Sequence, residues 1–122
     1  QKRDEAMDIY HGWCNLKAGV SDTAFAEAFA NYMGDLKARG KVESYRLTRR
    51  KLGLGPAHLA EFHFMIEVKD LAQLDEAFKL VSARGEPIET AHHGVNSLVQ
   101  DVTFALYRDF PDPQRIRGEE KF

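Results

Sequence analysis

The stretch spanning residues 60–68 limits the possible folds of this chain more than any other. It contains four large apolar residues at every second position: Phe62, Phe64, Ile66 and Val68. More polar residues such as Glu61, His63 and Glu67 lie between them. Alternation with a period of two predicts a β-strand that has one apolar face and one mixed face. Because the apolar face runs the whole length of the stretch, we expect a central strand that other elements cover.

The composition indicates a single globular domain. The chain has 122 residues, of which 43% are hydrophobic and 30% are charged, and this is enough for one buried core. A net charge of -2 gives no reason to expect nucleic acid or a membrane surface as a partner. Cys14 is the single cysteine, and the chain shows neither a long apolar run nor a signal peptide. We therefore expect a cytoplasmic protein.

The domain is expected to span residues 7–110. Residues 1–6 precede the first methionine, Met7, and are interpreted as an N-terminal extension. Residues 111–122 begin with Pro111, contain a second proline and are mostly charged afterwards, which is typical of an extended C-terminal arm.

A strand and a helix are predicted in the first third of the chain. Residues 8–17 are rich in aromatic and bulky side chains, as in a strand, but both of its faces are mixed, so its facing stays open. Ser21 or Asp22 is the expected N-cap of a helix that runs to about Arg39, with Gly40 as its C-cap. One apolar stripe follows the helical period; it consists of Phe25, Phe29, Tyr32, Met33 and Leu36.

The remaining elements are three strands, one helix and a segment that could be a second helix. Residues 42–50 and 60–68 are expected to form a hairpin with a glycine-rich connection at 51–57. Asp70 and Gln73 form a capping box that begins a helix ending near Gly85. Residues 88–98 could form a short helix or an irregular loop, since Gly94 weakens a helix, and residues 99–107 form the last strand.

This order of elements predicts a ferredoxin-like α+β sandwich with the topology βαββαβ. Right-handed connections would place both helices on one face of a four-stranded antiparallel sheet, with the first and third strands central. Period two directs nine residues toward the helices: Tyr45, Leu47, Phe62, Phe64, Ile66, Val68, Val102, Phe104 and Leu106. The other face mixes apolar and polar groups, and a second copy could cover it to form a homodimer.

Three stretches resemble a known group of proteins: residues 8–13 (DIYHGW), 45–56 (YRLTRRKLGLGP) and 104–111 (FALYRDFP). They are similar to the dimeric α+β barrel superfamily, and most of all to an uncharacterised bacterial family within it. That superfamily includes cofactor-free monooxygenases, haem-degrading enzymes and stress-responsive barrel proteins. The resemblance implies the fold and a homodimer. It carries over no enzyme motif, and we expect no cofactor.

The candidate site residues lie mainly on the open face of the predicted sheet. His63 or His11 could act as a general base, with Arg46 as an electrophilic partner. Trp13, Met65, Glu67 and Tyr107 could line a ligand site on the same face, and His92 and Asn96, at i and i+4, could line a pocket together.

A metal site is the rival interpretation of the histidines. His11 and His63, with Glu61 or Glu67, have the residue types of a two-histidine, one-carboxylate iron site or a three-ligand zinc site. Ligands on different strands leave no short motif, and we favour histidines that form hydrogen bonds within the sheet face, with no metal.

Three functions remain open at this stage. The first is a homodimer that binds a small apolar or aromatic molecule in a pocket beside the sheet. The second is a cofactor-independent enzyme similar to a monooxygenase or an isomerase. The third is a non-catalytic dimerisation module whose polar sheet face specifies the dimer. A cavity lined by His11, His63 and Arg46 would favour ligand binding or catalysis, whereas the same side chains closed onto each other across the dimer interface would favour the module.

Overall fold

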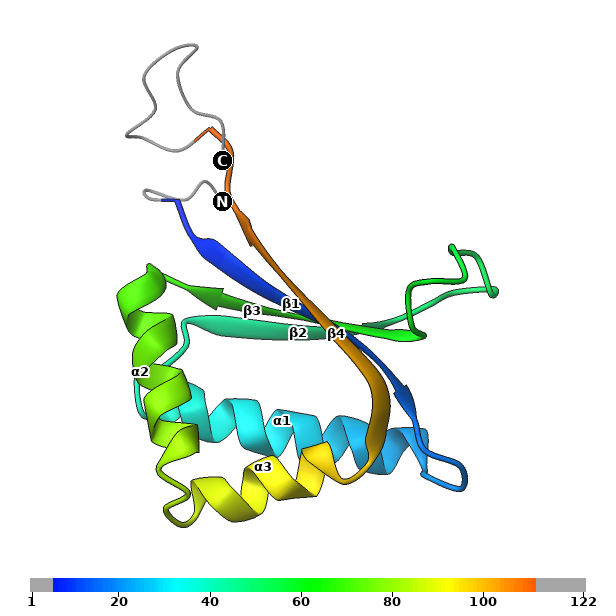
Figure 1. Ribbon diagram of the computed structural model, residues 1–122, viewed down its shortest axis with the longest axis horizontal. Coiled ribbons are helices and arrows are strands. Elements are labelled where there is room, and N and C mark those ends of the chain that lie inside the picture. Colours follow the sequence, from blue (N-terminus) through cyan, green and yellow to red (C-terminus); the bar gives the residue numbers. More distant parts are fainter. Residues whose placement is uncertain (1–5, 112–122) are drawn as a thin grey trace.

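A computed structural model describes residues 6–111 of the chain. It shows one antiparallel sheet of four strands in the order β2-β3-β1-β4, with the helices on one face (Figure 1). The predicted ferredoxin-like fold and its central strands, β1 and β3, are confirmed. The elements are β1 (Asp8–Leu16), α1 (Asp22–Ala38), β2 (Ser44–Arg49), β3 (Phe62–Val68), α2 (Leu71–Ser82), α3 (Ile88–Asn96) and β4 (Val99–Arg108).

Strand β3 has the two faces that its alternation predicts. Phe62, Ile66 and Val68 are buried against the helices, as a central strand under a helical layer requires. Phe64 lies on the same face and packs against the main core cluster. The apolar face of β3 is therefore the surface on which the helical layer is assembled.

The pairing of β1 with β3 determines which side chains of β1 point toward the helices. Gly12 lies opposite Phe64, and a Cβ atom at Gly12 would overlap the Phe64 ring. Gly12 therefore gives the ring its space on the helix side of the sheet. Tyr10 and Cys14 share this side, whereas His11 and Trp13 lie on the open face.

The ends of the first two helices follow their capping residues. The hydroxyl of Ser21 accepts a hydrogen bond from the backbone N–H of Ala24, and Gly40 adopts a positive φ of 72° just after α1. At α2, Asp70 accepts a hydrogen bond from the N–H of Gln73, whose side chain accepts one from the N–H of Lys69. The first bond is the N-cap half of the predicted capping box, and the second reaches the N–H of the residue before the N-cap instead of that of the N-cap itself.

The segment after α2 forms a helix of its own. α2 ends at Ser82, and α3 runs through Gly94 and packs mainly against α1. The helical alternative for this segment is therefore correct. Tertiary contact with α1 outweighs the low helix propensity of one glycine.

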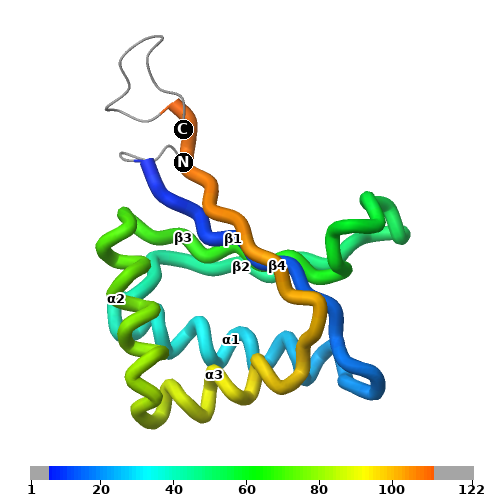
Figure 2. Tube along the Cα trace, viewed as in Figure 1, coloured from blue at the N-terminus to red at the C-terminus, as the bar shows by residue number. Residues whose placement is uncertain are grey.

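Strand β4 departs from the expected burial. Val102, Phe104 and Leu106 lie on the helix side of the sheet, but they are 38%, 54% and 51% exposed. β4 is an edge strand, and its path away from α3 is traced in Figure 2. The helices therefore leave its apolar side partly uncovered.

The expected N-terminal extension and C-terminal arm fall almost wholly outside the described residues.

Candidate functional site

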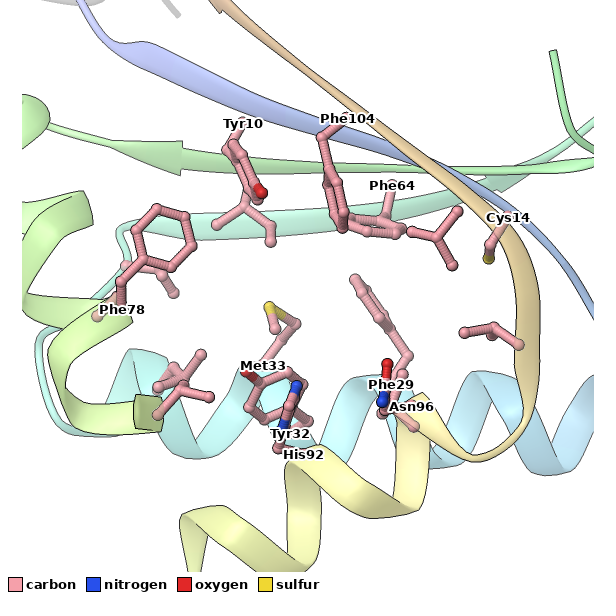
Figure 3. A pocket seen from close by; sticks show the side chains of 18 of the residues that line it. Tyr10, Cys14, Phe29, Tyr32, Met33, Phe64, Phe78, His92, Asn96 and Phe104 are labelled. Carbon is pink, nitrogen blue, oxygen red and sulfur yellow. The ribbon is translucent and has the colours of Figure 1, made fainter. Parts of the chain in front are cut away.

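A cavity lies between the sheet and the helices. Its volume is about 200 Å³, and its walls are mostly aromatic and aliphatic. Figure 3 shows the side chains that point toward it, from β1 and β4 on one side and from α1 and α3 on the other. The main apolar contributors are Tyr10, Phe29, Met33, Phe64, Phe78 and Phe104. The core of this fold is thus incompletely filled at one place.

Aromatic rings form the sheet side of the cavity. Tyr10 and Phe104 lie nearly parallel, with ring centroids 5.2 Å apart and planes at 11°. Phe64 meets Phe104 edge to face at 6.3 Å, and Phe78 meets Tyr10 in the same way at 5.5 Å. Such contacts hold the rings in fixed orientations. This wall is suited to an apolar molecule.

The opposite side carries most of the polar groups of the cavity, and the Tyr10 hydroxyl belongs to the sheet side. The rings of Tyr32 on α1 and His92 on α3 are 5.5 Å apart, and Asn96 follows His92 by one helical turn (Figure 3). The spacing of i and i+4 places His92 and Asn96 on one side of α3, as the sequence predicts for a helix. These groups give an otherwise apolar cavity one end that can form hydrogen bonds.

The cavity's phenol and thiol groups stay protonated at neutral pH. Burial raises the pKa of Tyr32 to about 12, with a smaller contribution from Tyr10, and burial also raises the pKa of Tyr10. Burial raises the pKa of the Cys14 thiol to about 11. The tyrosines can therefore donate hydrogen bonds, whereas Cys14 is not poised as a nucleophile.

The cavity reaches solvent between α2 and β4. Phe78 from α2 and Val102 and Phe104 from β4 line it, and all three are exposed. The exposed apolar side of β4 is therefore also the entrance of the cavity. A ligand could enter without separating the helices from the sheet.

A second cluster occupies the open face of the sheet. Nδ1 of His11 lies 2.8 Å from Nε2 of His63. The two rings are inclined by only 15° with centroids 5.0 Å apart, so they meet through their nitrogens. The ring of Trp13 lies parallel to that of His63 with the centroids 4.6 Å apart, and the ring of Tyr107 meets that of His11 edge to face with the centroids 4.8 Å apart. One imidazole donates to the other, and each is fixed by an aromatic neighbour.

Both imidazoles favour the neutral form. Burial lowers the pKa of His11, and burial followed by the charge of His11 lowers the pKa of His63. Neutral imidazoles suit the observed hydrogen bond, because it requires one ring nitrogen to keep its lone pair.

The other residues predicted for the open face are not gathered into one site. Arg46 is exposed on β2 opposite Met65, and Glu67 accepts a hydrogen bond from the hydroxyl of Ser44. Tyr107 reaches the histidine pair from β4. The open-face candidates thus lie across the sheet from the cavity, and only His92 and Asn96 among the predicted residues line it.

Two features are absent from residues 6–111. No group of three or more histidine, cysteine, aspartate or glutamate side chains in this part of the chain is arranged to hold a metal ion. Within the same range, none of the helices combines the length and apolar character that crossing a membrane requires.

Residues 7–122 match the model of a family described as "Family of unknown function (DUF6614)". The chain belongs to this family. No curated protein matches the sequence. The DUF6614 assignment agrees with the predicted resemblance to an uncharacterised family.

Solved structures place the DUF6614 chain among ferredoxin-like proteins. A dimeric ferredoxin-like protein of unknown function from Jannaschia sp. CCS1 has a TM-score of 0.62 at 12% identity and covers 83% of this chain and 97% of its own. A dabb family protein from Mesorhizobium loti has a TM-score of 0.58 at 16% identity, with coverages of 84% and 96%. SnoaB, a cofactor-independent oxygenase from Streptomyces nogalater, has a TM-score of 0.61 at 10% identity, with coverages of 93% and 100%. Likeness at these identities shows the shared fold.

Several residues of the cavity were not among the predicted site residues. Tyr32 and Phe29 belong to the α1 stripe, and Phe64 and Phe104 to the apolar faces of their strands, so all were assigned to the core. The signal available in the sequence was the surplus of aromatic rings on facing elements.

Proposed function

We propose that this protein binds a small, mainly apolar molecule with an aromatic part in the cavity between the sheet and the helices. The supporting observation is an apolar space of about 200 Å³ that has aromatic walls, one polar end and an opening to solvent. This combination is typical of ligand sites. The volume is below the roughly 300–1,000 Å³ of pockets for drug-sized molecules, so the ligand is small.

We also propose that the protein is a cytoplasmic homodimer, formed through the open sheet face. Trp13, His63 and Tyr107 give this face a cluster of aromatic rings that a solvated surface does not need. The similar protein from Jannaschia is described as dimeric. A second copy would cover the cluster symmetrically.

Ligand binding is tested by closing the entrance. Val102→Trp adds a large ring at an exposed position of the entrance, and Leu52→Trp adds the same ring on an exposed loop as a matched control. Calorimetric titration with naphthalene derivatives should show binding to the parent protein and to the control, with at least a tenfold loss for Val102→Trp. Equal binding by both variants would remove the cavity as the site.

A second candidate is a cofactor-independent enzyme that moves a proton on the bound molecule. His92 is the imidazole that lines the cavity, and histidine commonly transfers protons near neutral pH. Tyr32 and Asn96 could hold the substrate beside it. This assignment moves the base from His11 and His63, which bond to each other, to His92.

Catalysis and simple binding predict different results for His92. If the protein is an enzyme, His92→Gln should abolish proton exchange between solvent and a bound phenolic or carbonyl compound, observed by NMR, while the affinity changes little. Exchange at the same rate in the variant would reject His92 as the base. A non-catalytic dimerisation module, the third candidate, would show neither exchange nor binding.

A further inference from the structure

We infer that the cavity selects an uncharged ligand and holds the ligand's single hydroxyl or carbonyl group against His92 and Asn96. This inference rests on the proposed binding function and specifies the chemical class of its ligand. Two observations carry it: the described lining contains no lysine, arginine, aspartate or glutamate, and Tyr32, His92 and Asn96 are grouped on its helix side.

The described lining contains no lysine, arginine, aspartate or glutamate. A carboxylate, phosphate or ammonium group placed among these side chains would lose part of its hydration and meet no lysine, arginine, aspartate or glutamate. Removing an ion from water without such a partner is unfavourable. Organic acids, amines and phosphorylated metabolites are therefore expected to bind more weakly than neutral molecules.

The polar end offers both a donor and an acceptor to a neutral oxygen. The amide of Asn96 can donate and accept, and the imidazole of His92 offers its two ring nitrogens for hydrogen bonds. The Tyr32 hydroxyl stays protonated and adds a donor beside His92. A ligand hydroxyl needs one acceptor and up to two donors, and a ligand carbonyl needs up to two donors, so this set can satisfy either group.

The apolar body of the ligand then lies on the aromatic wall. Figure 3 shows Tyr10 and Phe104 across the cavity from His92 and Asn96, so a molecule held at the polar end extends toward those rings. The stacked rings of Tyr10 and Phe104 give the ligand body an apolar wall. We therefore expect a molecule of one or two rings with its oxygen at one end.

The experiment compares three probes of equal ring size at pH 7.5: 1-naphthol, naphthalene and 1-naphthoate. Calorimetric titration should show that 1-naphthol binds at least tenfold more tightly than 1-naphthoate and more tightly than naphthalene. Asn96→Leu should lower the affinity for 1-naphthol about tenfold and leave the affinity for naphthalene unchanged. Asn31→Leu, on the exposed side of α1 and outside this cavity, is the matched control and should leave both affinities unchanged.

The outcomes separate the inference from the function on which it rests. Binding of 1-naphthoate as tight as that of 1-naphthol would overturn the selection for uncharged ligands while leaving binding intact. An unchanged affinity of Asn96→Leu for 1-naphthol would overturn the polar contact. Failure of all three probes to bind the parent protein would contradict the proposed function itself. Circular dichroism of each variant confirms that the fold is retained.

Discussion

The Nδ1 atom of His11 lies 2.8 Å from the Nε2 atom of His63, so a hydrogen bond between imidazoles ties the two central strands on the open face. Both rings cannot be cationic in this geometry, because two protonated imidazoles leave no acceptor. Further titratable groups on this face are Arg46 on β2, Glu67 on β3 and Tyr107 on β4. The pair is therefore sensitive to acid.

We expect stability to fall in weak acid because of this pair. Both histidine pKa values are lowered in the folded state from the ordinary value of 6.5. The unfolded chain therefore binds more protons as the pH drops below about 6.5, and the free energy of unfolding decreases until the folded pKa values are passed. Urea unfolding between pH 8 and pH 5 measures this loss.

A double variant identifies the source of the pH dependence. His11→Asn with His63→Gln keeps uncharged amides near the two bonded nitrogens, and it should flatten the decrease between pH 6.5 and pH 5. His93→Asn, at an exposed position on α3, should retain the parent profile. A parent-like slope in the double variant would show that other groups control acid stability.

Homodimer formation is tested at two adjacent positions of β4. Tyr107 and Leu106 are 59% and 51% exposed, on the open face and the helix side respectively. Tyr107→Glu should convert the dimer to a monomer at micromolar concentration, because burying an unpaired carboxylate costs several kcal/mol. Leu106→Glu should remain dimeric. Light scattering measures both masses, and a monomeric parent protein would refute the proposed dimer.

Two glycines should respond in opposite directions to alanine. Gly12→Ala places a methyl group against the Phe64 ring, and we expect a loss of about 1–3 kcal/mol in the free energy of unfolding. Gly94→Ala, in α3 with open space around it, should raise stability by about 0.5–1 kcal/mol. Chemical denaturation of both variants measures the difference. A neutral Gly12→Ala would show that the ring moves aside easily.

The cavity walls should differ in their contribution to stability. Phe29 is 3% exposed, and Phe29→Ala should cost about 3–5 kcal/mol, as large core truncations do. Phe104→Ala should cost much less, because this side chain is already half exposed at the entrance. It should nevertheless weaken ligand binding. Equal losses of stability would mean that Phe104 is covered in solution.

Patterns that depend on a regular period predicted most of the fold. The alternation in β3, the stripe of α1 and the capping box at Asp70 all specify local geometry, and the structure confirms them. The facing of β1 could not be predicted, because both of its faces are mixed. It is decided by Gly12 and Phe64, which are far apart in the sequence and meet only when β1 pairs with β3.

The candidate site was harder to predict because it is a space that side chains from distant parts of the sequence leave empty between the sheet and the helices. His11 and His63 on the open sheet face were predicted as general bases because of their polar side chains, but they form a hydrogen bond with each other. The cavity depends on how far the helices stand from β4, and no residue pattern encodes that distance. His92 and Asn96 were accessible to prediction because their spacing needs only a helix.

Successive side chains of β1 point alternately into the cavity and onto the open face of the sheet. Tyr10 faces the cavity, and its neighbour His11 faces the surface proposed for the second copy. Consecutive positions of one strand therefore report on different properties: substitutions at Tyr10 or Cys14 probe occupancy of the cavity, and those at His11 or Trp13 probe assembly. A single strand thus supplies paired reporters that experience the same backbone motion from opposite sides.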